Sequence, residues 1–142
     1  MNKGNLYLIP SLLGDAETDK SLPLSIVNHI KSINIFIVEN VRSARRFIKK
    51  IDKQKEISTC TFYAYGKHND INLETDFLPL ILKGEDVGII SEAGLPCIAD
   101  PGSEIVKYAH DFQITVVPLV GPSSIFLALM ASGLNGQNFI FH

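Results

Sequence analysis

The architecture of this chain can be inferred from one continuous segment, Val87-Gly88-Ile89-Ile90-Ser91-Glu92-Ala93-Gly94-Leu95-Pro96-Cys97-Ile98-Ala99-Asp100-Pro101-Gly102. Its first four residues are apolar, which is typical of a strand buried on both faces of a sheet. The twelve residues that follow hold two glycines, two prolines and two carboxylates, and a helix is expected at 103–112. Asp100 is a candidate N-cap of that helix, and Pro101 suits its first turn. The order of strand, loop and helix predicts one unit of a parallel α/β sheet.

The same alternation continues on both sides of this segment. Strands are expected at 6–9, 33–38, 59–64, 87–90 and 114–117, and helices at 22–30, 41–51, 73–82, 103–112 and 125–132. The stretch 10–23 carries Gly14, Asp15 and other polar residues and is expected to be a loop. The predicted fold class is therefore α/β, with a parallel-rich five-stranded sheet and helices on both faces. Ligands bind such sheets outside the carboxyl ends of the strands, so the loops after residues 9, 38, 90 and 117 are the candidate site.

Composition limits the classes of protein that need to be considered. The chain has 142 residues, of which 46% are hydrophobic and 20% charged, and this is globular composition. The net charge of −2 argues against a protein that binds nucleic acid through its overall charge. The only two cysteines, Cys60 and Cys97, do not suggest a disulfide framework, so a cytoplasmic location is expected. No signal peptide is recognised, and the longest apolar run, 125–131, is too short to span a bilayer.

Three segments at the expected ligand edge carry candidate binding groups. In the loop 91–102, Gly94 allows a close approach of ligand and backbone, and Glu92 and Asp100 can accept hydrogen bonds from an ammonium or from ribose hydroxyls. The loop 10–15 lacks a GxGxxG pattern, which disfavours a nicotinamide or flavin site. The segment 121–124 begins an apolar helix whose free amides can face a cofactor. All three segments also fit ordinary connections with capped helices.

The helix expected at 41–51 has two different faces. Its apolar face is formed by Val41, Ala44, Phe47, Ile48 and Ile51. Seven of the 13 basic residues lie between positions 42 and 55, namely Arg42, Arg45, Arg46, Lys49, Lys50, Lys53 and Lys55. These form the other side, which is a candidate surface for phosphate groups or, alternatively, a solvated helix face. No paired metal-ligand spacing, CxxC motif or Ser-His-Asp set is present, so a metal site or a hydrolase is not expected.

Taken in order, these segments resemble a known family. The chain is similar to the 16S ribosomal RNA ribose-2′-O-methyltransferase I family of the tetrapyrrole (corrin/porphyrin) methylase superfamily. Gly4 to Pro10 resembles the family's opening strand, and Val38 to Phe47 its EDTR-x-x-x-x-L stretch. Ser91 to Gly102 resembles the signature SDAG-T-P-x-x-SDPG, Val117 to Ser124 the P-x-PGPSA hinge, and Ala131 to Leu134 the SGL motif. The resemblance runs over essentially the whole chain, and the twelve-residue signature is its most specific part.

The resemblance implies an S-adenosylmethionine-dependent methyltransferase in which the cofactor lies between two domains. It implies an N-terminal α/β domain at 1–118, with a hinge and the start of a truncated C-terminal domain at 119–142. By the same resemblance, the cofactor-binding residues are Pro10, Ser11, Leu13, Gly14, Asp15, Ser91, Glu92, Ala93, Gly94, Pro96, Ser123 and Ser124. The expected substrate is RNA of the small ribosomal subunit, held by Arg42, Arg45 and Arg46. The family's members are commonly dimers, so a homodimer is expected.

Several signature positions differ from the family pattern. Glu92 stands where the family has Asp, Leu95 where it has Thr, and Ala99 where it has Ser; Asn40 replaces the Asp of EDTR. Because these changes fall in the expected site, the chain is interpreted as a divergent member, and three hypotheses stay open. These are an RNA methyltransferase, a tetrapyrrole methyltransferase and a non-catalytic ligand-binding module. If the acceptor is a ribose hydroxyl, the candidate catalytic bases are Glu39, Glu92 and Asp100.

Overall fold

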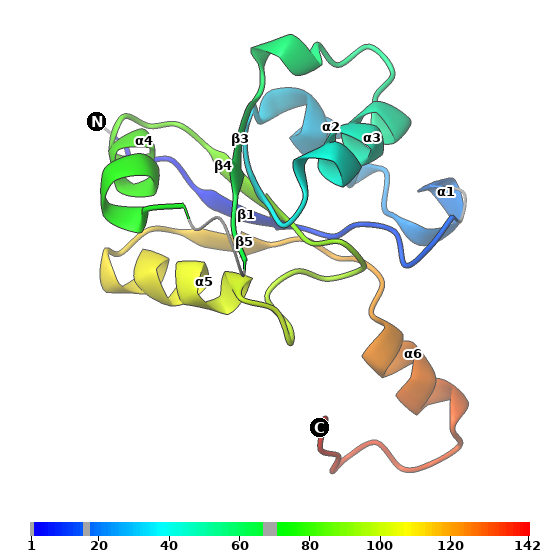
Figure 1. Ribbon diagram of the computed structural model, residues 1–142. Coiled ribbons are helices and arrows are strands. Elements are labelled where there is room, and N and C mark those ends of the chain that lie inside the picture. The colour runs from blue at the N-terminus through cyan, green and yellow to red at the C-terminus, as the bar shows by residue number, and fades with distance from the viewer. Residues whose placement is uncertain (1, 16–17, 67–70) are drawn as a thin grey trace.

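The computed structural model describes residues 2–15, 18–66 and 71–142. Within them, five parallel strands form one sheet in the order β3-β2-β4-β1-β5 (Figure 1). The strands are β1 (Leu6–Ile9), β2 (Ile35–Val38), β3 (Thr61–Ala64), β4 (Val87–Ile90) and β5 (Val116–Pro118). The predicted fold class, a parallel five-stranded α/β sheet, is confirmed.

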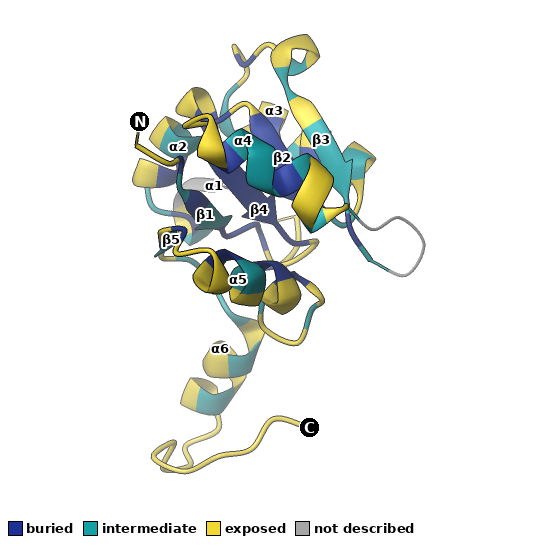
Figure 2. Cartoon of the chain, turned by 90° about the vertical axis from the view of Figure 1, so that its left-hand side faces the viewer, coloured by how far each residue is buried: buried dark blue, intermediate teal, exposed yellow. Residues whose placement is uncertain are grey.

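Helices cover both faces of the sheet. The helices α2 (Ser25–Ser32) and α3 (Val41–Ile51) pack on one face, where Phe36 and Val38 of β2 point. The helices α4 (Leu78–Leu82) and α5 (Gly102–Asp111) pack on the other face, where Ile35 and Ile37 point. Because successive strand residues face opposite sides, a continuous apolar strand supplies both cores at once. The dark-blue strands between helices with yellow outer surfaces show this layering (Figure 2).

Three predictions for the first half of the chain are wrong in detail. A short helix, α1 (Thr18–Ser21), lies within the stretch 10–23 that was expected to be a loop. The strand expected at 33–38 begins only at Ile35, because the amide of Ile33 donates to the carbonyl of His29 and so completes the end of α2. Strand β3 likewise begins at Thr61, after the 3₁₀ turn Ile57–Thr59. Tertiary contacts therefore shift the element ends but not their order.

The helix expected at 73–82 is divided into two pieces. Residues Leu73–Phe77 form a π-helical turn, and α4 begins after it at Leu78. Pro79 has no backbone N–H and suits the first turn of α4 better than the middle of a longer helix. The side chain of Asn72 accepts hydrogen bonds from the amides of Glu74 and Thr75, both at 3.0 Å, and caps the π-helical turn. The chemistry of proline and the cap together explain the division.

The segment after β5 extends away from the sheet. Helix α6 (Ser124–Ala131) projects away from the sheet (Figure 1). It has no buried residue, and the exposed apolar side chains include Phe126 and Met130 on the helix and Ile140 after it. This is the part of the chain that the resemblance assigns to a hinge and a second domain, and the division at residue 118 stays a prediction. No helix in the described part of the chain is long and apolar enough to cross a membrane.

Lys55 corrects the interpretation of the basic helix. The sequence pattern groups it with the exposed cations, but its side chain is only 7% exposed. Its ammonium donates to the carbonyl of Lys31 at 2.9 Å, the carbonyl of Ile33 at 2.8 Å and Oδ1 of Asn34 at 2.7 Å. A buried ammonium requires such partners. Lys55 therefore fastens the α2–β2 junction and is removed from the candidate phosphate surface.

Candidate functional site

Three loops meet where β1, β4 and β5 end, and backbone hydrogen bonds join them. The amide of Ser11 donates to the carbonyl of Gly94 at 2.9 Å, and the amide of Leu95 donates to the carbonyl of Pro122 at 3.1 Å. The hydroxyl of Ser11 is buried and donates to the carbonyl of Ser91 at 3.0 Å. The segments 10–15, 91–96 and 119–124, which the sequence singles out separately, therefore form one unit.

Gly94 makes this meeting of loops possible. Its φ of +67° lies in the left-handed region that side chains disfavour. A Cβ at this position would lie 2.8 Å from Cδ2 of Leu13 and 2.8 Å from the carbonyl oxygen of Pro122. The sequence predicts that Gly94 admits a ligand close to the backbone. The structure shows a close approach between loops of the protein itself, and the approach of a ligand stays a prediction.

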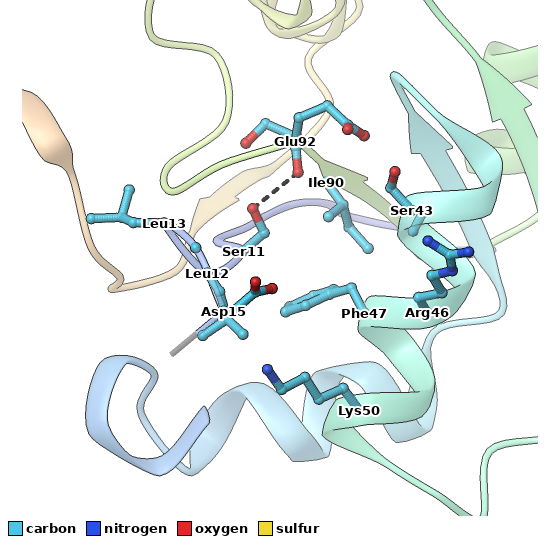
Figure 3. A pocket seen from close by; sticks show the side chains of 13 residues that line it. Ser11, Leu12, Leu13, Asp15, Ser43, Arg46, Phe47, Lys50, Ile90 and Glu92 are labelled. Atoms are coloured by element: carbon cyan, nitrogen blue, oxygen red, sulfur yellow. Dashed lines mark hydrogen bonds between the residues drawn. The ribbon is translucent and has the colours of Figure 1, made fainter. Parts of the chain in front are cut away.

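A polar cavity lies between these loops and α3. Its volume is about 270 Å³, and Figure 3 shows side chains from the loop after β1, from α3 and from the loop after β4 pointing into it. Two carboxylates, Asp15 and Glu92, come from the loops, and two cations, Arg46 and Lys50, come from the helix. The full lining of this polar cavity is Ser11, Leu12, Leu13, Gly14, Asp15, Ser43, Ala44, Arg46, Phe47, Lys50, Ile90, Ser91 and Glu92.

A second, apolar cavity lies beside the hinge and is lined by a later part of the same loop, from Leu95 to Ile98. Its volume is about 530 Å³, and no residue that lines it carries a charged side chain at neutral pH. The lining of this apolar cavity is Leu8, Leu95, Pro96, Cys97, Ile98, Pro118, Leu119, Val120 and Gly121. The amide of Leu119 donates to the carbonyl of Leu8 at 3.0 Å, so the segment after β5 is held against β1. The two cavities differ sharply in charge and size.

The predicted cofactor residues are divided between these cavities. Ser11, Leu13, Gly14, Asp15, Ser91 and Glu92 line the polar cavity, and Pro96 lines the apolar one. Pro10 is buried and packs against Gly121, while the carbonyl of Ala93 accepts a hydrogen bond from the Ser91 hydroxyl at 3.3 Å. Ser123 and Ser124 line neither cavity and lie at the start of α6. Ser43 and Phe47 were not singled out as site residues, and Lys50 was named only as part of the basic side of the helix. The spacing of Ser43 and Lys50, three residues before and four after Arg46, was a usable signal.

The three candidate bases have different surroundings. Oε1 of Glu39 accepts a hydrogen bond from the backbone amide of Glu92 at 3.1 Å, which ties the ends of β2 and β4 together. Asp100 accepts hydrogen bonds from the amide of Cys97 at 2.8 Å and from that of Gly102 at 2.7 Å. Its carboxylate therefore orders its own loop and the start of α5. Of the three, only Glu92 lines the polar cavity.

The arginines of α3 project from different sides of the helix. The guanidinium of Arg45 lies 5.2 Å from the centre of the Phe62 ring on β3, whereas Arg46 lines the polar cavity. Arg42 is exposed near the start of the helix. Asn40 caps this helix by accepting a hydrogen bond from the amide of Ser43 at 3.0 Å. The structure therefore brings only one of the three predicted substrate-binding arginines to the cavity.

Two titratable groups at the loop 97–102 have raised pKa values, the buried Tyr65 and the half-buried Cys97. The Tyr65 side chain is 4% exposed and its hydroxyl has no hydrogen-bond partner within the described residues. Burial, followed by the nearby Asp100 carboxylate, raises the pKa of Tyr65 well above its ordinary value. The same two causes, in the same order, raise the pKa of the Cys97 thiol to about 12. Both groups are therefore neutral at physiological pH.

Alkylation should report the state of Cys97. Because only the thiolate reacts, we expect iodoacetamide to modify Cys97 very slowly at pH 7.5, with a rate that rises roughly tenfold per pH unit up to about pH 12. The Cys60→Ser variant isolates this reaction, which mass spectrometry follows with time. Rapid modification at pH 7.5 that levels off below pH 9 would contradict the assigned environment.

Among the described residues, no group of three His, Cys, Asp or Glu side chains is arranged to hold a metal ion.

The chain is similar to known proteins over nearly its whole length. No protein-family model matches the chain. A protein of Streptococcus pyogenes serotype M3 (strain ATCC BAA-595 / MGAS315) named "Ribosomal RNA small subunit methyltransferase I" is 34% identical over 140 residues, which cover 98% of this chain and 46% of that protein. The chain is a homologue of these methyltransferase I proteins.

Two further relatives carry the same name. The Bacillus subtilis (strain 168) protein is 34% identical over 139 residues, covering 98% of this chain and 45% of its own length. The Pseudomonas aeruginosa protein (strain PAO1) is 28% identical over 141 residues, covering 99% of this chain and 47% of its own. The chain thus spans about half the length of the curated relatives it matches, and the shared half contains both cavities.

Proposed function

We propose that this chain forms the cofactor- and RNA-binding half of an S-adenosylmethionine-dependent methyltransferase that acts on a ribose 2′-hydroxyl of small-subunit ribosomal RNA. The observation that carries the proposal is a pair of unlike cavities, lined by successive parts of the loop after β4, at the carboxyl edge of a parallel sheet. The printed names of the relatives support the reaction class and the RNA substrate. The family resemblance adds a homodimer, and the two cysteines without a disulfide framework add a cytoplasmic location.

The apolar cavity fits the cofactor better than the polar one. Its volume of about 530 Å³ lies within the range of about 300–1,000 Å³ that is usual for small-molecule sites. The adenosine part of S-adenosylmethionine is large and uncharged, which suits a lining without charged side chains. When bound, it supplies an already activated methyl group. Leu95, Pro96 and Leu119 would pack against its adenosine part, and the loop crossing at Gly94 would fix their positions.

The polar cavity is proposed to receive the acceptor, so Ser11, Leu13, Gly14, Asp15 and Glu92, which the resemblance assigns to the cofactor, would instead face the RNA. Methyl transfer from a sulfonium depends mainly on positioning, and a ribose hydroxyl also benefits from a base. Glu92 is the proposed base because its carboxylate lines this cavity. Glu39 is a positioning residue, since it holds the backbone amide of Glu92 at 3.1 Å. Asp100 orders the loop 97–102 and is proposed to act on the site only through that loop.

The RNA backbone is proposed to follow the exposed side of α3. Arg42 and Arg46 would contact phosphates, whereas Arg45, which stacks over Phe62, would contribute less. Binding through phosphates weakens steeply with salt, with a slope of log K against log salt that falls by about 1 for each lost contact. The 142-residue chain is expected to bind its ligands weakly and without turnover.

Ligand titrations distinguish this proposal from its two alternatives. Fluorescence anisotropy with a labelled small-subunit RNA fragment should show binding to this chain that weakens with salt, and a soluble tetrapyrrole should not compete. Tetrapyrrole binding without RNA binding would favour a tetrapyrrole methyltransferase. Cofactor binding with neither acceptor would favour a non-catalytic module. Transfer itself is assayed with radiolabelled S-adenosylmethionine on a protein of the relatives' full length that carries this chain as its first half.

A further inference from the structure

We propose that the polar cavity between α3 and the loops after β1 and β4 binds one unstacked nucleotide of the RNA strand. The base would stack on Phe47, the phosphate would pair with Arg46 and Lys50, and Asp15 and Glu92 would accept hydrogen bonds from sugar or base donors. This inference rests on the proposed function and assigns a role to residues that the sequence motifs leave out.

The charges of the polar cavity indicate a ligand with two kinds of polar group. Arg46 and Lys50 lie on the helix side, and Asp15 and Glu92 lie on the loop side (Figure 3). A carboxylate accepts hydrogen bonds but cannot donate them, and the two cations only donate. A simple anion would be attracted by the cations and repelled by the carboxylates. A nucleotide presents a phosphate together with hydroxyl and base N–H donors, so it complements both sides.

Phe47 supplies the surface that a base requires. Its ring is half-buried and stands in the wall of the polar cavity between the charged groups (Figure 3). Sequence-specific and single-stranded RNA contacts commonly place an unstacked base on such an aromatic side chain. The volume of about 270 Å³ is slightly below the usual range for whole small-molecule ligands, so one nucleotide is the largest unit expected there.

The helix itself provides a matched pair of arginines for the test. Arg46 lines the polar cavity, and its neighbour Arg45 lies 5.2 Å from the centre of the Phe62 ring, on the β3 side of the helix. The two side chains have the same charge and both are exposed. Replacing either one removes the same net charge, so a difference between the two variants reports the cavity and not the overall charge of the protein.

The experiment is a nuclear magnetic resonance titration of the ¹⁵N-labelled 142-residue chain. Uridine 5′-monophosphate is expected to shift the amide signals of Asp15, Ser43 and Phe47 and to bind at least fivefold more tightly than uridine or inorganic phosphate alone. Arg46→Ala and Phe47→Leu should each weaken this binding about tenfold, whereas Arg45→Ala should change it less than twofold. Amide spectra of the free variants verify that each remains folded.

Three results would overturn the inference. These are equal losses from Arg45→Ala and Arg46→Ala, equal affinity for phosphate and nucleotide, or shifts confined to residues of the apolar cavity such as Cys97 and Leu119. A parallel titration with S-adenosylmethionine separates this inference from the proposed function. Cofactor shifts at Cys97 without nucleotide shifts at Phe47 would reject the nucleotide site alone. Nucleotide shifts without any cofactor binding would instead reject the methyltransferase proposal.

Discussion

Gly94→Ala is expected to destabilise the protein by about 2–4 kcal/mol and to separate the three loops of the site. The left-handed backbone costs alanine about 1–2 kcal/mol. The added methyl group would lie 2.8 Å from both Cδ2 of Leu13 and the carbonyl oxygen of Pro122, and such overpacking typically costs about 1–3 kcal/mol. Urea unfolding followed by circular dichroism measures the free energy of unfolding.

Gly14→Ala is the matched control for this substitution. Gly14 lies in the neighbouring loop, and a Cβ there would meet no atom within 4 Å. The free energy of unfolding of the Gly14→Ala variant should therefore stay within about 0.5 kcal/mol of that of the unmodified chain. An equal effect of the two substitutions would show that the loops are not held together at Gly94, and the division into two cavities would lose its structural basis.

Lys55→Met is expected to lower the free energy of unfolding by about 2–3 kcal/mol. The substitution keeps most of the apolar part of the side chain but removes the ammonium. This ammonium donates hydrogen bonds to the backbone carbonyls of Lys31 and Ile33 and to Oδ1 of Asn34. Hydrogen bonds to a charged group are worth about 1.5–3 kcal/mol, and the two carbonyls would lose a partner near the start of β2. Thermal and urea unfolding both measure the loss.

The control for Lys55 lies two residues earlier in the chain. Lys53 is exposed, so Lys53→Met should change stability by less than about 0.5 kcal/mol. A loss from Lys55→Met as small as that of the control would mean that the buried ammonium contributes little to the α2–β2 junction, contrary to the account given above.

The order of the elements was predictable because it depends on periodic burial. Continuous apolar runs such as 87–90 can only be central strands in a sheet covered on both faces, and the structure places them there. The element ends were less predictable, because they depend on particular partners. The amide of Ile33 completes α2, and Pro79 divides the helix expected at 73–82. Neither effect can be detected from hydrophobic periodicity.

The candidate site was predictable as a set of loops but not as a geometry. Parallel strands end at one edge, so the segments around Ser11, Ser91 and Pro122 were expected to be neighbours. Which side chains share a cavity depends on the rotation of α3, and this separates Arg45 from Arg46. The burial of Lys55 was also hidden, because its acceptors lie more than 20 residues away in the sequence. Charge patterning alone cannot distinguish a buried cation from an exposed one.

The central claim is that the cofactor occupies the apolar cavity and not the polar one. Its most direct test is a titration of the ¹⁵N-labelled chain with S-adenosylmethionine. We expect weak binding, with saturable shifts of the amide signals of Cys97, Leu119 and Val120, which line the apolar cavity, and little change at Ser43 and Phe47. Shifts confined to Ser43 and Phe47, or no saturable shift at millimolar cofactor, would contradict the claim.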